Sequence, residues 1–270
     1  MTFPAAETIR KRKSVRTFDG TPLKEADKAA LEAYAQTVTN PFGIPVHFRL
    51  LNAKALGLSS PVIVGAEAYL AAKVVKTEHF ELAFGYSFEQ VCLYAASLGI
   101  GTVMLAATLS RSAFEVAMDL GENEVMPLAS PVGYPAKKQS VRESLMRKGL
   151  KADERKSFET LFFDGSFDKP LSMQKAGLFA EALELASWAP SAGNQQPWRA
   201  VVAGNTVHFY ERQSLKESAL GDVQQVDVGI CLCHFELVMR EKDKTCTFLF
   251  QDPGLAAPEK TRYLVSCEVK

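Results

Sequence analysis

The sequence has no excess of charge of either sign: 31 lysines and arginines stand against 31 aspartates and glutamates. A nucleic-acid surface is expected to carry a basic excess, so nucleic acid is not an expected partner. Cysteine is scarce and odd in number, and the five cysteines show neither zinc-site spacing nor a disulfide framework. We expect them to be small buried side chains, with Cys231 and Cys233 facing different sides of a helix. The four histidines show no ligand spacing either, so no metal site is predicted.

One long run without charge stands out, residues 91–109 (VCLYAASLGIGTVMLAATL). Its length alone suggests a membrane span. However, Gly99 and Gly101 interrupt it, and alanine, serine and threonine make up much of the rest. A buried helix, a glycine turn and a buried extended segment explain it better, so a membrane is not an expected partner. The first residues, MTFPAAETIRKRKS, lack the apolar core of a secretory signal, which predicts a cytoplasmic protein.

Two segments of the chain resemble each other, one starting at Pro22 and the other at Pro170. Each opens with Pro-Leu, continues through an amphipathic helix that a proline ends, and passes a glycine into a strand with an aromatic-arginine pair. Two buried helices, at residues 85–99 and 226–241, follow in the same order. Two closing strands, at residues 125–134 and 262–269, come last. This shared order indicates an internal duplication.

The junction between the halves is predicted near residue 165, where Asp164-Gly165 and Pro170 favour a turn. The chain then divides into residues 1–165 and a shorter second half, residues 166–270, packed as one pseudo-dimeric unit. The charged run of residues 142–156 is predicted to be an exposed helical connection. Long helices alternate with short β-rich runs at residues 45–52, 60–66, 198–204 and 206–212. This mixture predicts an α+β fold with a central, mainly antiparallel sheet covered by helices.

Residues 9–18, IRKRKSVRTF, place basic side chains around a hydroxyl group. If the segment is extended, Arg12, Ser14 and Arg16 project from one face. If it is helical, Arg12 and Arg16 are four residues apart and still converge. Guanidinium groups bind phosphate through paired hydrogen bonds, so either conformation offers a phosphate site. The alternative is a basic surface arm without a ligand, and the residues alone leave both open.

Two other segments offer what a flavin ring requires. Residues 189–198, APSAGNQQPW, form a loop with hydrogen-bonding side chains, and residues 99–107, GIGTVMLAA, are small enough for close approach to the backbone. A flavin ring needs an apolar floor, hydrogen bonds to its pyrimidine edge, an N–H group near N5 and positive charge near N1 and O2. A polar surface loop and tight helix–strand packing are the alternatives for these two segments.

Together these residues resemble the nitroreductase family of FMN enzymes. That family has an R-x-S-x-R/K-x-F run, a P-S-x-x-N-x-Q-P-W loop, a buried helix ending L-G-x-G, and G-Y-P followed by R-K. The resemblance implies a nitroreductase-like fold, FMN as cofactor and NAD(P)H as electron donor. The matching segments are RKSVRTF at residues 12–18, PSAGNQQPW at 190–198, LGIG at 98–101, GYP at 133–135 and Arg155-Lys156.

In that family FMN lies between two subunits, with the arginine run from one subunit and the Pro-Ser-Asn loop from the other. The resemblance implies that Arg12 and Ser14, helped by Arg155, hold the phosphate, and that Arg16 lies toward the ribityl chain and O2. No side chain is assigned as catalytic. The ring side would consist of the backbone at Leu105, Ala106 and Ala107 and, from the opposite half, Pro190, Ser191 and Asn194.

This chain departs from the usual order of the family's motifs. Where the loop normally follows the arginine run, it has NPFGIPVHF, without the serine and the second asparagine. The intact loop lies in the second half, whose own start (SFDKPLSM) lacks the arginine run. The halves are therefore complementary, and one complete FMN site per chain is expected. This resembles the single-chain, fused-repeat branch of the family, sometimes labelled transmembrane nitroreductases.

The expected function is an FMN-dependent oxidoreductase that passes electrons from NAD(P)H to a small electron-poor acceptor. The alternatives are another FMN reaction on the same fold, such as a dehydrogenase or a flavin-cleaving enzyme, a flavin-binding or sensing protein without turnover, and a scaffold without cofactor. The residues leave open the acceptor, the choice between NADH and NADPH, and a further homodimer. His234, inside an apolar helix, is interpreted as a satisfied packing residue rather than a catalyst.

Overall fold

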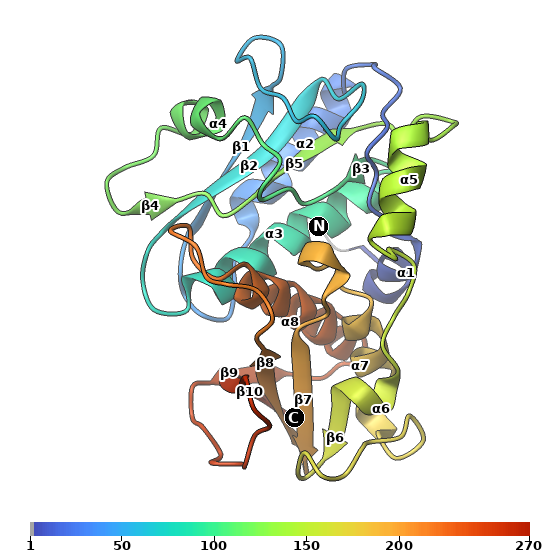
Figure 1. Cartoon of the computed structure of the whole chain (residues 1–270), viewed down its shortest axis with the longest axis vertical. Helices are drawn as coiled ribbons and strands as arrows, with labels where there is room; N and C mark the ends of the chain where they lie inside the picture. Colours follow the sequence, from blue (N-terminus) through green and yellow to red (C-terminus); the bar gives the residue numbers. More distant parts are fainter. Residues whose placement is uncertain (1–2) are drawn as a thin grey trace.

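The computed structural model describes residues 3–270, which form two five-stranded sheets with helices between and around them (Figure 1). This confirms the predicted α+β fold, although two sheets are present where one central sheet was expected. Every strand pair within the sheets is antiparallel except β6 with β7. The first sheet has the order β1 (Val46–Asn52), β2 (Ala68–Val75), β5 (Ala129–Gly133) and β3 (Gly101–Thr102), with β4 (Glu124–Val125) paired to β2. The second has the order β6 (Phe162–Asp164), β7 (Trp198–Ala203), β8 (Thr206–Arg212), β10 (Thr261–Val269) and β9 (Cys246–Leu249).

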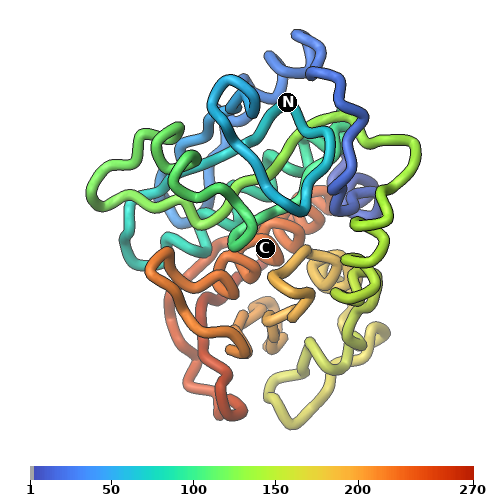
Figure 2. Tube along the Cα trace, turned by 45° about the horizontal axis from the view of Figure 1, so that its top comes forward, coloured from blue at the N-terminus to red at the C-terminus, as the bar shows by residue number. Residues whose placement is uncertain are grey.

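Two long helices, α3 (Phe80–Ser97) and α8 (Val223–Glu241), pack against each other in the middle of the molecule. Figure 1 shows α3 beside the first sheet and α8 beside the second, and Figure 2 shows the two halves meeting along these helices. Most residues of both helices are buried, as their apolar composition requires. The other helices are α1 (Ala5–Lys11), α2 (Glu25–Thr37), α4 (Arg111–Met118), α5 (Val141–Gly149), α6 (Phe158–Leu161) and α7 (Ala180–Ser187).

The two long helices cross at a pair of glycines. A Cβ on Gly85 would lie 2.0 Å from the carbonyl oxygen of Val226, and a Cβ on Gly229 would lie 2.3 Å from that of Leu82. Only glycine permits such an approach of two backbones. The contacts are reciprocal, so Gly85 on α3 corresponds to Gly229 on α8, as in an isologous interface. This reciprocity supports two related halves, which stays a prediction.

Most predicted strands are present, and one is wrong. The runs at residues 45–52, 198–204 and 206–212 form β1, β7 and β8, and the closing strands correspond to β4 with β5 and to β10. Residues 60–66 instead form a turn with a single bridge at Val64. The neighbouring strand is β2, which lies between β1 and β5 and is buried along most of its length. Because β2 is buried along most of its length, its sequence shows no alternation of apolar and polar residues.

The second sheet begins before the predicted boundary at residue 165. α6 and β6 precede residue 165, yet β6 pairs with β7 in the second sheet. The division of the chain at residue 165 stays a prediction.

The uncharged run of residues 91–109 divides as predicted. Helix α3 ends at Ser97, Gly99 has a φ of +76°, and Gly101 begins β3. A Cβ on Gly101 would lie 2.9 Å from the side chain of Val15, so packing accounts for this glycine. Among the helices of residues 3–270, none combines the length and the apolar character that crossing a membrane requires.

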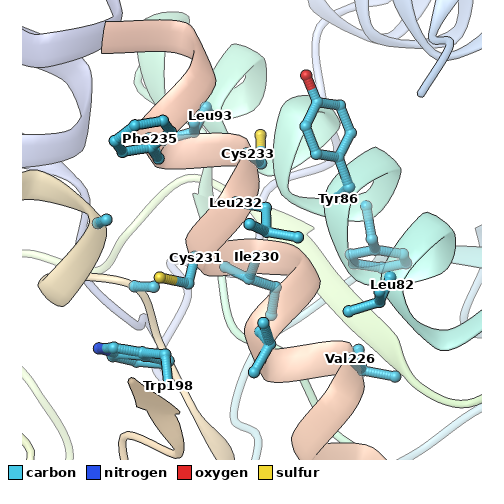
Figure 3. Close-up of a cluster of buried hydrophobic side chains, with 14 of the residues drawn as sticks. Leu82, Tyr86, Leu93, Trp198, Val226, Ile230, Cys231, Leu232, Cys233 and Phe235 are labelled. Atoms are coloured by element: carbon cyan, nitrogen blue, oxygen red, sulfur yellow. The ribbon is translucent and has the colours of Figure 1, made fainter. Parts of the chain in front are cut away.

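The cysteines of α8 are packing residues, as predicted. Cys231 and Cys233 are fully buried. Figure 3 shows them pointing to different sides of α8, among apolar side chains from α3 and β7. Core side chains therefore pack on more than one side of α8, which fixes its position beneath the site described next.

Candidate cofactor site

The basic arm, residues 12–18, leaves α1 and runs extended beside the first sheet. Arg12 has an extended backbone, with φ −61° and ψ 132°. The Val15 amide donates to the Thr102 carbonyl at 2.9 Å, and Ser14 forms a parallel bridge with Thr102. Of the two conformations considered, the extended one is therefore correct. Arg12, Ser14 and Arg16 line one cavity, together with Lys11 and Lys13.

This cavity, called the arginine cavity below, has a volume of about 380 Å³. Five guanidinium groups line it, from Arg10, Arg12, Arg16, Arg147 and Arg155. Arg147 comes from α5 and was not among the predicted site residues. Its Nη1 lies 3.5 Å from the Ser14 carbonyl oxygen, which fastens α5 to the arm.

The guanidinium groups repel one another in a partly desolvated space. Burial lowers the pKa of Arg155, and the charge of Arg12 lowers it further. Burial likewise lowers the pKa of Arg16, against the opposing effect of Glu143, and Arg147 adds to the lowering. A polyanionic group placed among these side chains would relieve both effects. The cavity is thus suited to a phosphate.

Arg16 lies at the inner end of the arginine cavity. Its side chain is 9% exposed, and Nε and Nη1 have no hydrogen-bond partner within residues 3–270. Its backbone N–H donates to Glu143 at 3.3 Å, and Thr17 Oγ1 donates to the same carboxylate at 2.7 Å. Glu143 is 2% exposed, so the predicted exposed connection instead turns one face of α5 into the site.

A second cavity of about 430 Å³, called the apolar cavity below, continues from the first. The two share Ser14, Arg16, Leu150, Pro190 and Ser191. Most of the surface of the apolar cavity is carbon. Its wall further includes Leu105, Ala106 and Ala107 from the first half and Val223, Asp227 and Ile230 from α8. Together the cavities have a cationic end and an apolar end.

The three backbone amides of residues 105–107 differ. The Leu105 N–H donates to the Ala129 carbonyl at 2.8 Å and belongs to the sheet. The N–H groups of Ala106 and Ala107 have no partner in the part of the chain that the structure describes. Of these three amides, only those of the two alanines are therefore available to a ligand in the apolar cavity.

The loop of residues 190–194 closes both cavities from the second half. Ser191 Oγ accepts the Gln196 N–H at 2.9 Å, and the Ala192 N–H donates to Asp227 Oδ2 at 3.0 Å. These bonds fix the loop internally and to α8.

Asn194 joins this loop to the connection that follows α5. Its side-chain amide donates to the carbonyl of Lys151 at 2.7 Å and to that of Glu154 at 3.1 Å. Gln196 accepts the Lys156 N–H at 2.9 Å beside it. The predicted role of Asn194 was contact with the flavin, whereas its amide group here holds the two halves together at the rim of the arginine cavity.

Asp227 is a site residue that the sequence reasoning missed. It is 3% exposed, and burial raises its pKa well above the usual range, with repulsion from Asp222 and Glu211 adding to this. Burial therefore favours the neutral form of this carboxyl group. The available signal was an acidic residue within an apolar stretch of a helix, because acidic side chains are rarely fully buried unless they are paired.

The structure brings the predicted residues together. Each lines the arginine cavity, the apolar cavity or both, and contact with a cofactor stays a prediction. They are Arg12, Ser14, Arg16, Leu105, Ala106, Ala107, Arg155, Pro190, Ser191 and Asn194.

Comparisons with known proteins address the family. Among solved structures, a protein titled "putative nitroreductase" from Thermotoga maritima has 19% identity and a TM-score of 0.65, covering 99% of this chain and 94% of its own. A "putative NADH dehydrogenase/NAD(P)H nitroreductase" from Bacteroides thetaiotaomicron has 21% identity, a TM-score of 0.42, and coverage of 52% and 91%. An FMN-dependent nitroreductase from Clostridium difficile has 13% identity, a TM-score of 0.42, and coverage of 52% and 94%.

No curated protein matches the chain. The Thermotoga maritima structure shows that the whole chain shares one fold with a nitroreductase-like protein. A sequence profile of the family described as "Putative TM nitroreductase" matches residues 5–239, which is most of the chain. The chain therefore belongs to this nitroreductase family.

Proposed function

We propose that this chain is an FMN-dependent oxidoreductase that carries electrons from NAD(P)H to a small electron-poor acceptor. The observation that carries the proposal is the continuity of the arginine cavity with the apolar cavity. FMN has a phosphate at one end and an aromatic ring at the other. The two ends of the composite cavity differ in the same way.

The cationic end fits a phosphate group. Arg12, Arg147 and Arg155 come from three separate segments and face one space, with Ser14 as a hydroxyl donor among them. Guanidinium groups bind phosphate oxygens through paired, charge-assisted hydrogen bonds. Asp153, the one acidic residue among residues 3–270 that lines this cavity, pairs with Arg147.

The apolar end fits the flavin ring. The N–H groups of Ala106 and Ala107, unpaired within residues 3–270, are suitable donors to the ring. Arg16, with two unpaired nitrogens within the same residues, lies at the boundary of the cavities. It offers positive charge on the side where reduction of the ring adds negative charge. These residues therefore bind the flavin ring and also favour its reduced form.

When bound, FMN supplies the chemistry, by accepting hydride from a nicotinamide and passing electrons to the acceptor. The chain's residues bind, orient and shield it. Pro190 and Leu150 exclude water from the boundary of the cavities, and Asp227 holds the loop through the Ala192 N–H. We assign no side chain as acid or base in this reaction.

The mirror-image place on α3 argues for a single site. On α8, Val223 and Ile230 line the apolar cavity. Because Gly85 corresponds to Gly229 in the helix crossing, His79 and Tyr86 stand in the equivalent positions of α3.

Aromatic rings pack at that place. Phe42, from the segment that replaces the Pro-Ser-Asn loop, has its ring centroid 6.2 Å from that of Tyr86 and 5.7 Å from that of Phe248. The ring of Phe250 stacks on that of His79, with 3.6 Å between the ring centroids. Aromatic side chains thus occupy the place that corresponds to the apolar cavity, and we propose one FMN site per chain.

Spectroscopy of purified protein tests the function. Protein mixed with FMN and freed of excess should stay yellow, and NADH or NADPH should bleach it in the absence of oxygen. A nitroaromatic or quinone should restore the absorbance. Free FMN with the same nucleotide serves as the control for direct reduction. A protein that retains no FMN, or a loaded protein that neither nucleotide reduces, would contradict the proposal.

A further inference from the structure

A buried cluster of three ionisable side chains lies behind the arginine cavity. Glu89 Oε1 on α3 is 2.7 Å from His234 Nε2 on α8 and 3.6 Å from Arg12 Nε at the end of α1. The side chains of Glu89 and His234 are 0% exposed, and that of Arg12 is 8% exposed. The cluster joins the two halves of the chain and ends at a residue of the cavity wall.

The hydrogen bonds of His234 determine how many protons this cluster holds. Its Nδ1 lies 2.9 Å from the carbonyl oxygen of Leu185. A carbonyl oxygen can only accept, so Nδ1 carries a hydrogen. Nε2 then either donates to a Glu89 carboxylate or accepts from a protonated Glu89. In both cases one proton is shared between Nε2 and Oε1, and the pair has no net charge.

A neutral pair has a consequence for Arg12. A lone carboxylate at 3.6 Å would cancel much of the positive charge of the guanidinium. Because His234 balances Glu89, the charge of Arg12 remains available to an anion in the cavity. Glu89 nevertheless presents an oxygen to Arg12 Nε, the one guanidinium nitrogen of Arg12 that is fully buried without a hydrogen-bond partner in residues 3–270.

We propose that Glu89 and His234 form a neutral, proton-sharing pair that positions Arg12 to bind the phosphate of FMN. The proposal rests on the proposed flavin function. Glu89 and His234 are positioning residues, since neither lines the cavity. Phosphate recognition by the first half therefore depends on a histidine from the second half.

Riboflavin differs from FMN only in lacking the phosphate. Comparing the affinities of the protein for FMN and for riboflavin therefore isolates the contribution of the phosphate. The double variant Glu89→Leu/His234→Leu removes the pair without changing net charge, according to the proton argument. We expect its affinity for FMN to fall by about tenfold, the effect of one charge-assisted hydrogen bond. Its affinity for riboflavin should change by less than about twofold. Fluorescence titration measures both affinities.

Tyr86→Phe is the matched control, because it removes another buried hydrogen bond between α3 and α8, from Tyr86 to Glu236. It should leave the ratio of the two affinities unchanged. If the double variant lowered the affinities for FMN and riboflavin equally, the pair would have only a structural role and the proposal would be overturned. An unchanged affinity for FMN would also overturn it. Wild-type protein that binds neither flavin would instead refute the flavin function, and this proposal with it.

Discussion

A single residue of this site, Arg16, lowers the stability of the ligand-free protein and favours ligand binding. Its guanidinium is nearly buried, and two of its nitrogens lack partners in residues 3–270. Unpaired buried polar groups cost folding free energy because they lose hydration without compensation. A residue with such a cost is typical of a site whose ligand completes its hydrogen bonds.

Replacing Arg16 by leucine should therefore have opposite effects on the two properties. Without flavin, Arg16→Leu should raise the free energy of unfolding by about 1–2 kcal/mol, since it removes the unpaired groups. FMN affinity should fall at least about tenfold, through loss of the charge. Urea denaturation and fluorescence titration measure these changes. Lys148→Leu, at an exposed position of α5, is the control. Lower stability with unchanged affinity would refute this reading of Arg16.

Some site residues could be predicted and others could not, because their positions depend on different ranges of structure. Arg12, Ser14 and Arg16 lie on one face because strand alternation is local to the arm. Arg147 and Asp227 reach the cavities only because α5 packs on the arm and α8 passes beneath the loop. Local patterns in residues 142–156 and 226–241 can mark an unusual residue such as Asp227, but they do not show which cavity it reaches.

The crossing of α3 and α8 is the element on which the composite site depends. The loop of residues 190–194 is fixed to α8 through Asp227, whereas residues 101–107 follow directly after α3. A change in the distance between the helices would therefore open or close the apolar cavity. The glycine contacts hold that distance at backbone contact.

Gly85→Ala should accordingly destabilise the protein strongly. The new Cβ would meet the backbone of Val226, which cannot move aside as a flexible side chain could. We expect a loss of about 3 kcal/mol and a Tm lower by roughly 6–12 °C. Gly149→Ala is the matched control, because a Cβ there meets nothing within 4 Å. Differential scanning calorimetry measures both Tm values. Equal Tm values for the two variants would show that the helices can separate freely, against this prediction.

The elements themselves were predicted where periodicity is strong. β1, β7 and β8 have the β-branched and aromatic residues typical of strands, and α3 and α8 show long apolar runs. Residues 60–66 have similar composition, but they turn beside the arm, and the strand that continues the sheet is the alanine-rich β2. The choice between them depends on pairing with β1 and β5, which is nonlocal.

At the scale of the whole molecule, each half contributes what the other lacks. The arm and residues 105–107 come from the first half, and the loop of residues 190–194 comes from the second. The duplication and the single FMN site remain predictions, and they share one measurable consequence.

That consequence is a flavin content of one FMN per chain after reconstitution. Absorbance of released flavin, divided by protein concentration from amino-acid analysis, measures it. The variant Arg12→Ala/Arg155→Ala should lose nearly all bound FMN, because no second site would retain a share. Two flavins per wild-type chain, or half of the flavin retained in the variant, would contradict the single-site arrangement.

The reciprocal glycine crossing also affects how the sequence of such a protein can evolve. In a two-fold dimer every substitution appears at both sites, so neither site can be altered while the other is kept. A single chain that contains both sides of the crossing is free of this constraint. Phe42 and Ser191 can then differ, and one side can keep its arginines while the other becomes ordinary aromatic packing. A single chain with both sides of such a crossing can therefore acquire asymmetry by single substitutions.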